Sequence, residues 1–200
     1  MRRALLVGIN DYPGAPLSGC VQDAEALGDI LGRNKDGSPN FDCRISTGPP
    51  TTITRTVLRK QIDELFAHEA DIALLYFSGH GTENNLGGYL VTPDIRGYDE
   101  GVAMTEVLTR ASQSRAKEAI IILDCCHSGA LGTVPAIGSA NAEAILREGV
   151  SILTASRSTQ VSLEIVGGQG VFTSLVLAAL DGGAADVMGR VTVASGSASE

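Results

Sequence analysis

Residues 120–129 read Ile-Ile-Ile-Leu-Asp-Cys-Cys-His-Ser-Gly, and this stretch decides the fold prediction. The apolar run has the length of a buried strand, and it ends abruptly in a carboxylate, two thiols, an imidazole and a glycine that permits a sharp turn. Thiols placed where a strand meets a turn are candidates for nucleophilic catalysis if a base lies nearby in space. The stretch therefore predicts a buried strand that carries reactive side chains to its carboxyl end.

A second segment has the same design and supplies a base. Residues 71–77 read Asp-Ile-Ala-Leu-Leu-Tyr-Phe, and they open into Ser78, Gly79, His80 and Gly81. The carboxyl ends of parallel strands meet at one edge of a sheet. If the two strands are neighbours and parallel, His80 meets one of the two cysteines at that edge.

Strand-like apolar runs alternate with segments of helical periodicity along the chain. Strands are predicted at 4–9, 43–46, 71–77, 120–124 and 150–155, with a short hairpin strand at 89–91, and helices at 18–33, 58–68, 104–111, 141–149 and 171–180. This alternation predicts an α/β fold with a mainly parallel central sheet of about six strands, flanked by helices on both faces. Sites in such sheets form at the carboxyl ends of the strands, where Asn10, Asp11, Ser78, His80, Asp124 and the two cysteines are expected.

Composition narrows the class of protein. The 200 residues suit one domain, placed at 1–190, with small polar residues at 191–200 that are expected to be a disordered tail or the start of a further segment. The net charge of −8 disfavours nucleic acid and anionic membranes as partners. The four cysteines lack the spacing of a disulfide framework, and no run resembles a signal peptide or a membrane span, so a cytoplasmic location is expected.

Two motifs, residues 76–81 and 124–129, resemble the catalytic pair of the caspase-like cysteine peptidases, in particular metacaspases and their bacterial relatives. His80 precedes Cys126 by 46 residues, close to the spacing of roughly fifty in caspases. The resemblance extends to residues 7–12, 17–24 and 170–173. It implies a caspase-type fold and endopeptidase activity, which spacing and composition alone would not show.

The resemblance also implies catalytic roles. Cys126 takes the place of the nucleophile that forms a thioester, and His80 takes that of the base that later protonates the leaving amine. The backbone N–H groups of Gly81 and Cys126 take the place of the oxyanion hole. Successive strand residues point to opposite faces, so Cys125 is expected to be a small buried side chain. A metal site at Cys125, Cys126 and His127 is the rival hypothesis, but no further Cys or His stands at a supporting spacing, so no metal or cofactor is predicted.

Specificity is the next implication of the resemblance. Metacaspases bind Arg or Lys, the residue before the scissile bond, in an acidic pocket, and the resembling positions here are Asp23, Ser78 and Asp124. Two carboxylates would match the planar fork of a guanidinium, so Arg should be preferred to Lys. The alternative is that Asp23 merely belongs to the first turn of a helix and that Asp124 caps a loop.

The sequence thus predicts a cysteine endopeptidase that cleaves protein or peptide substrates after Arg or Lys. Its relatives suggest the protease effector of a bacterial stress, defence or regulated-cell-death system, with a sensor or adaptor elsewhere. The alternative is a catalytically idle caspase-like module used for recognition or as a scaffold.

Two finer expectations concern regulation. Asp94 and Asp99 are present, but residues 101–106 lack the paired aspartates expected of a calcium-dependent metacaspase, so calcium-independent activity is predicted. Between His127 and Leu146 the only charged residue is Glu143. The chain is therefore predicted to stay uncut across this linker.

Overall fold

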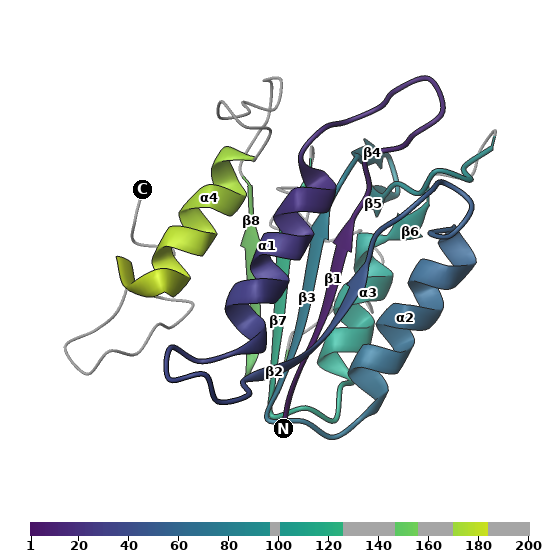
Figure 1. Ribbon diagram of the computed structural model, residues 1–200. Coiled ribbons are helices and arrows are strands. Elements are labelled where there is room, and N and C mark those ends of the chain that lie inside the picture. The colour runs from purple at the N-terminus through teal and green to yellow at the C-terminus, as the bar shows by residue number, and fades with distance from the viewer. Residues whose placement is uncertain (97–100, 126–146, 156–169, 184–200) are drawn as a thin grey trace.

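The computed structural model describes residues 1–96, 101–125, 147–155 and 170–183. Its centre is a parallel sheet of five strands in the order β2-β1-β3-β7-β8 (Figure 1). The strands are β1 (Arg2–Gly8), β2 (Phe41–Ser46), β3 (Ile72–Ser78), β7 (Glu118–Asp124) and β8 (Val150–Thr154). The predicted α/β class with a mainly parallel sheet is confirmed.

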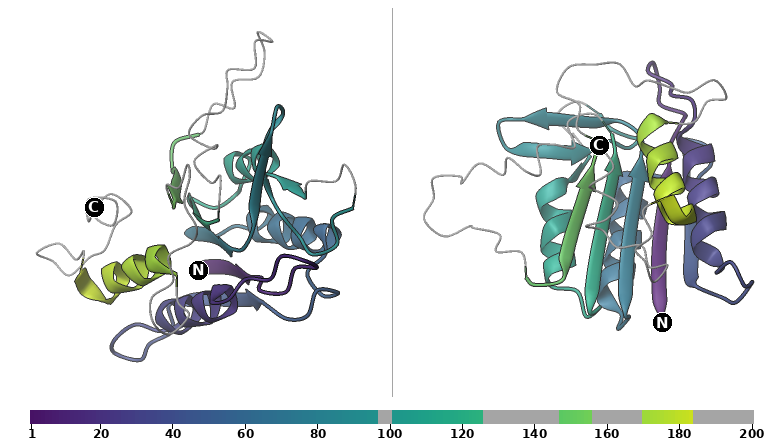
Figure 2. Two further views of the ribbon diagram at one scale, coloured as in Figure 1. Left: turned by 90° about the horizontal axis from the view of Figure 1, so that it is seen from above. Right: turned by 90° about the vertical axis from the view of Figure 1, so that its left-hand side faces the viewer.

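Helices cover both faces of this sheet. They are α1 (Cys20–Gly32), α2 (Arg55–Ala67), α3 (Met104–Ser112) and α4 (Val171–Ala178), which continues into the short π-helical turn η2 (Ala179–Gly183). Seen from above, α1 and α4 lie on one side of the sheet and α2 and α3 on the other (Figure 2). None of the helices in the described part of the chain is long and apolar enough to cross a membrane.

Alternation along the strands divides the core into two clusters. In β3, Leu75 and Phe77 belong to the cluster that includes the apolar side chains of α2 and α3, whereas Leu74 and Tyr76 belong to the cluster with those of α1. Both clusters are buried, so both faces of the central strands need apolar side chains. This explains why the central strands are apolar along most of their length. The same alternation assigns a face to each residue at the strand ends.

A second, antiparallel sheet follows β3 and corrects one prediction. It contains β4 (Gly81–Asn84), β5 (Gly87–Leu90) and β6 (Val102–Ala103). The short strand expected at 89–91 therefore pairs outside the central sheet, which has five described strands rather than about six. β4 was missed because its sequence, Gly-Thr-Glu-Asn, is short and polar and has no apolar alternation.

Pairing brings the ends of three strands level with one another. Gly8 pairs with Ser78 across β1 and β3, and Ser78 pairs with Asp124 across β3 and β7. Gly8 has no side chain, which lets α1 begin directly against this edge: a Cβ at Gly8 would lie 2.2 Å from the carbonyl oxygen of Cys20. The expectation that the motif-bearing strands end side by side is therefore confirmed.

Several predicted features lie outside the described residues. These are Cys126, His127, Asp99, the linker that was expected to stay uncut, most of the helix predicted at 141–149, and the terminal residues 191–200.

Candidate active site

His80 stands two residues beyond the end of β3 and is held at both its backbone and its ring. Its backbone N–H donates to the Tyr12 hydroxyl at 3.1 Å, and its Nε2 lies 2.8 Å from the carbonyl oxygen of Ala15. A carbonyl can only accept, so Nε2 carries the hydrogen. In the neutral imidazole, Nδ1 is then the nitrogen that is able to take a proton from a nucleophile.

Tyr12 also contacts the imidazole directly. The two rings meet edge to face, with centroids 4.6 Å apart and planes at 61°. Gly79 accommodates this contact, because a Cβ there would lie 2.5 Å from the Tyr12 hydroxyl oxygen. Burial raises the pKa of the Tyr12 hydroxyl far above its ordinary value, so Tyr12 stays protonated.

Of the two adjacent cysteines in the motif at residues 124–129, the structure describes only Cys125. Cys125 is 6% exposed and belongs to the core cluster on the α2 and α3 side of the sheet. The prediction that Cys125 is a small buried side chain is thus confirmed. Its neighbour Cys126, the predicted nucleophile, lies outside the described residues.

The three residues predicted for substrate binding come together on the other side of the sheet. Asp23 of α1 is 2% exposed and Ser78 of β3 is 3% exposed. The Ser78 hydroxyl donates to Asp23 Oδ2 over 3.5 Å, a long hydrogen bond, and the backbone N–H of Gly170 donates to Asp23 Oδ1 at 3.2 Å. Asp124 follows the same alternation as Ser78, its partner in the β3–β7 register.

Asp124 is reached by a chain of hydroxyls. Thr173 of α4 donates to Asp124 Oδ2 at 2.7 Å, and the Tyr76 hydroxyl lies 2.6 Å from Thr173 Oγ1. Because Thr173 has one proton and gives it to Asp124, Tyr76 must donate to Thr173. Burial above all raises the pKa of Tyr76, with the negative charges of Asp23 and Asp124 as the next causes, so Tyr76 remains a donor.

Gly170 marks how near the two carboxylates are. A Cβ at this position would lie 2.9 Å from Asp124 Oδ2 and 3.1 Å from Asp23 Oδ2. Two carboxylate oxygens therefore flank one point in space. Their negative charges act on the Cys20 thiol. Its pKa is raised to about 11, first by burial and further by the charges of Asp23 and Asp124.

The predicted oxyanion donor Gly81 begins β4 and pairs with Leu90 of β5. The preceding residues are hydrogen-bonded, since the Val91 N–H donates to the His80 carbonyl at 3.0 Å. Antiparallel pairs alternate between bonded and non-bonded, so the ladder does not use the Gly81 N–H, which faces away from β5.

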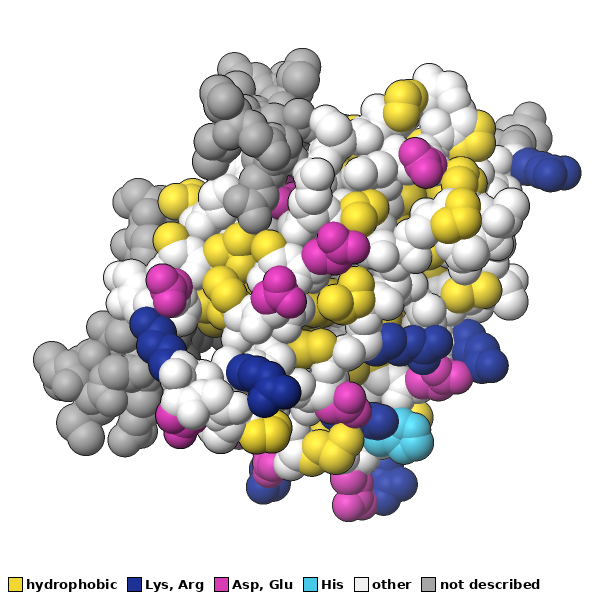
Figure 3. Space-filling model, viewed as in Figure 1, with side chains coloured by type: hydrophobic (Ala, Val, Ile, Leu, Met, Phe, Trp, Pro, Cys, Tyr) yellow, Lys and Arg dark blue, Asp and Glu magenta, His cyan; other side chains and the backbone are white. Residues whose placement is uncertain are grey.

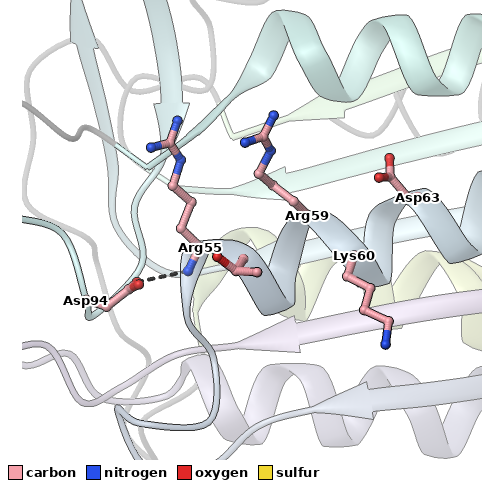
Figure 4. A pocket seen from close by; sticks show the side chains of 6 residues that line it. Arg55, Arg59, Lys60, Asp63 and Asp94 are labelled. Carbon is pink, nitrogen blue, oxygen red and sulfur yellow. Dashed lines mark hydrogen bonds between the residues drawn. The ribbon is translucent and has the colours of Figure 1, made fainter.

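A hollow lined by charged residues lies elsewhere, at the start of α2 (Figure 4). Asp94 Oδ1 accepts from the Arg55 N–H at 2.9 Å and from the Thr92 hydroxyl at 2.7 Å, so Asp94 satisfies the first N–H of this helix, whose N-cap is Thr54. Arg59 is paired with Glu106. These contacts hold the helix end in place, and they assign no chemistry to the hollow. Within the described ranges, no group of three or more His, Cys, Asp or Glu side chains could hold a metal ion.

Charges of both signs are interspersed over the face covered by α1. In the space-filling view, Lys and Arg side chains stand among Asp and Glu side chains over the lower part of that face (Figure 3). The described residues on this side of the molecule therefore form no broad basic surface.

Sequence reasoning placed His80, Asp23, Ser78 and Asp124 at this edge but missed four supporting groups. They are the Tyr12 hydroxyl, the Ala15 carbonyl, the Gly170 N–H and the Thr173 hydroxyl. Three of these residues fall in the stretches 7–12 and 170–173 that carried the family resemblance, which was the available signal.

Comparison with known proteins supports one family. The chain is similar in fold to the crystal structure of protein GSU0716 from Geobacter sulfurreducens, with a TM-score of 0.65, 18% sequence identity, and coverage of 92% of this chain and 83% of that one. No curated protein matched the sequence. The family model described as caspase domain, Peptidase C14, matches residues 1–193. Because that match takes in nearly the whole sequence, the chain belongs to the caspase domain family of cysteine-type peptidases.

Proposed function

We propose that the protein is a cysteine endopeptidase that cleaves after basic residues, with Arg preferred to Lys. The observation that carries the proposal is the closeness of two carboxylates. Oδ2 of Asp23 and Oδ2 of Asp124 lie 3.1 and 2.9 Å from the position that a Cβ at residue 170 would take. Both stand at the strand edge from which His80 also extends. A guanidinium placed between two carboxylates gains charge-assisted hydrogen bonds that a single ammonium cannot fully match.

In the proposed reaction, Cys126 acts together with His80 and Gly81. The Cys126 thiol gives its proton to His80 Nδ1 and attacks the scissile carbonyl carbon, so the carbonyl oxygen becomes an oxyanion near the Gly81 N–H. The C–N bond then breaks, and the amine leaves with the proton from His80. Water, deprotonated by His80, hydrolyses the thioester and releases the new carboxylate and the thiol.

The substrate pocket should reject acidic residues. An aspartate before the scissile bond would meet two like charges in a partly desolvated site, at a cost of several kcal/mol if both carboxylates are ionised. The family's alternative specificity, for acidic residues, is therefore disfavoured by the same pair of side chains that favours Arg.

The test compares two adjacent cysteines and three peptides. Wild-type protein should react with a peptidyl electrophile that carries Arg, and it should cleave fluorogenic peptides in the order Arg, then Lys, then Asp. Cys126→Ala should abolish labelling and cleavage, while the matched variant Cys125→Ala should keep both. Equal labelling of wild type and Cys126→Ala would refute the peptidase mechanism. If wild type, Cys126→Ala and Cys125→Ala all fail to react with the electrophile, an idle recognition module is favoured.

The same assay addresses regulation. Activity should persist when a chelator removes calcium, and intact-mass measurement should find one uncut chain in the active protein. A requirement for calcium, or a stoichiometric cut between Cys126 and Val150, would contradict these two proposals. We further propose that the domain acts as the protease effector beside a sensor or adaptor that binds elsewhere, which co-purification from the native host would identify.

A further inference from the structure

The loop between β1 and α1 lies at the same end of the sheet as the β4–β5 hairpin (Figure 1). In this loop, the Tyr12 side chain contacts His80 in two ways: its ring meets the imidazole, and its hydroxyl accepts from the His80 backbone N–H. Its carbonyl accepts from the Ala15 N–H and so closes the turn that ends at Ala15.

The Tyr12 hydroxyl bridges His80 and Val91, where one hydrogen bond of the β4–β5 ladder is missing. His80 and Val91 stand where the next bonded pair of β4 and β5 would fall, and one of the two bonds is present: the Val91 N–H donates to the His80 carbonyl at 3.0 Å. The reciprocal bond is replaced by a bridge. The His80 N–H donates to the Tyr12 hydroxyl at 3.1 Å, and that hydroxyl donates to the Val91 carbonyl at 3.2 Å. The bridge leaves His80 fixed to the hairpin while its backbone departs from regular pairing.

The backbone of Tyr12 places the partner of the imidazole. The Ala15 N–H donates to the Tyr12 carbonyl at 3.2 Å, which closes a four-residue turn with Pro13 and Gly14 at its centre. Gly14 has a φ of +79°, the combination of proline followed by left-handed glycine that favours a type II turn. The carbonyl of Ala15 then accepts from His80 Nε2 at 2.8 Å.

We propose that Tyr12 is the positioning residue of the catalytic base: it fixes the His80 backbone through its hydroxyl and the His80 tautomer through the turn that presents Ala15. The inference rests on the proposed function, in which Nδ1 of His80 exchanges the proton. Loss of the bridge would let the imidazole shift relative to the thiol and the scissile bond. A displacement of about 1 Å in a reacting group costs up to about a hundredfold in rate.

The decisive variant is Tyr12→Phe, which keeps the ring and removes the bridge. On the Arg peptide, kcat should fall about ten- to a hundredfold, while KM should change less than about threefold because Tyr12 does not belong to the acidic pocket. The matched control is Tyr89→Phe on β5, which should retain wild-type kcat and KM. If Tyr12→Phe lowers kcat no more than Tyr89→Phe does, the proposal is overturned.

A second measurement is independent of peptidase activity. In ¹⁵N-labelled protein, Tyr12→Phe should shift the His80 amide signal and the imidazole nitrogen signals, and it should leave the His68 imidazole signals unchanged. Unchanged His80 signals would overturn the positioning role, even if kcat fell through lower stability. Should the wild type prove to lack peptidase activity, the proposed function fails, whereas the NMR comparison still decides whether Tyr12 sets the geometry of His80.

Discussion

The carboxylates at the two ends of the central sheet differ in the partners that the structure describes for them. At the amino end, Asp71 is half exposed and pairs with the N-terminal amine of Met1 and with Lys117, whose Nζ lies 2.6 Å from Asp71 Oδ1. At the carboxyl end, the hydrogen bonds described for Asp23 and Asp124 include those from the uncharged donors of Ser78, Gly170 and Thr173.

Under the proposed function, the carboxylates at the carboxyl end bind a cationic substrate group, whereas Asp71 at the amino end forms exposed ion pairs. Exposed ion pairs contribute little to stability, because water solvates both partners and salt screens them. At the carboxyl end Asp23 is buried, and the negative charges of Asp23 and Asp124 help raise the pKa of the Cys20 thiol to about 11, after the larger effect of its burial. A cationic substrate group entering the carboxyl end would therefore gain more than one at the amino end.

The largest expected effect comes from removing one charge at each end. Asp23→Asn should lower kcat/KM for the Arg peptide at least about 30-fold, because losing one member of a buried charge pair costs roughly 2–5 kcal/mol. Asp71→Asn should leave kcat/KM unchanged. Steady-state kinetics on both variants measure this contrast. Equal kinetics for the two variants would abolish the distinction between the ends of the sheet.

A smaller effect is expected from crowding the two carboxylates. Gly170→Ala places a Cβ 2.9 Å from Asp124 Oδ2, so the carboxylate must move. We expect about a tenfold loss for Arg and a smaller loss for Lys, since the planar fork of Arg depends more on acceptor orientation. The measurement is the ratio of kcat/KM for the two peptides.

The matched control for crowding is Gly32→Ala at the end of α1, where a Cβ would meet no heavy atom within 4 Å. This variant should keep the Arg-to-Lys ratio of the wild type. A ratio in Gly170→Ala that equals that of Gly32→Ala would mean that Gly170 does not shape the pocket.

The sequence predicted the edge of the sheet better than the contacts made there. Apolar runs located the strands that end at Ser78 and Asp124, because burial on both faces leaves a continuous hydrophobic signal. The buried face of α1 was also readable in part: of the apolar residues that recur at helical spacing, Ala24, Leu27 and Leu31 are buried.

Hydrogen bonds between distant segments left no such signal. Tyr76 and Thr173 are 97 residues apart, and Tyr12 and His80 are 68 residues apart. Each contact depends on the register and on how a helix or loop is seated, which no periodicity encodes. The family resemblance marked the stretches around Tyr12 and Thr173 without assigning them a task.

The third effect in size is expected from interrupting the hydrogen-bond chain that runs from Tyr76 through Thr173 to Asp124. Thr173→Val removes the donor to Asp124 and takes from the buried Tyr76 hydroxyl one of its two side-chain partners, Thr173 and Ser78, at a cost of about 1–3 kcal/mol in unfolding free energy. Thr173→Val combined with Tyr76→Phe should recover part of that loss, because the second change removes the hydroxyl that has lost its partner Thr173. Urea unfolding of both variants measures the recovery. A double variant less stable than Thr173→Val alone would show that the chain runs differently.

The smallest effect concerns the ion pairs at the amino end. The hydrogen bond and charge of Lys117, followed by those of the N-terminal amine, lower the pKa of Asp71 to about 2 from an ordinary value of 3.8. A pKa lowered in the folded state means that the ionised carboxylate stabilises the fold above about pH 4, and that this contribution is lost as the pH falls toward 2. Wild type should therefore be slightly more stable than Asp71→Asn at pH 6 in low salt, and the difference should shrink both toward pH 3 and in 1 M NaCl, where the Debye length is about 3 Å. Urea midpoints at the two pH values and two salt concentrations measure it. A difference that persists at high salt would mean that Asp71 acts through packing or neutral hydrogen bonds, and the contrast between the two ends of the sheet would then be one of degree rather than of kind.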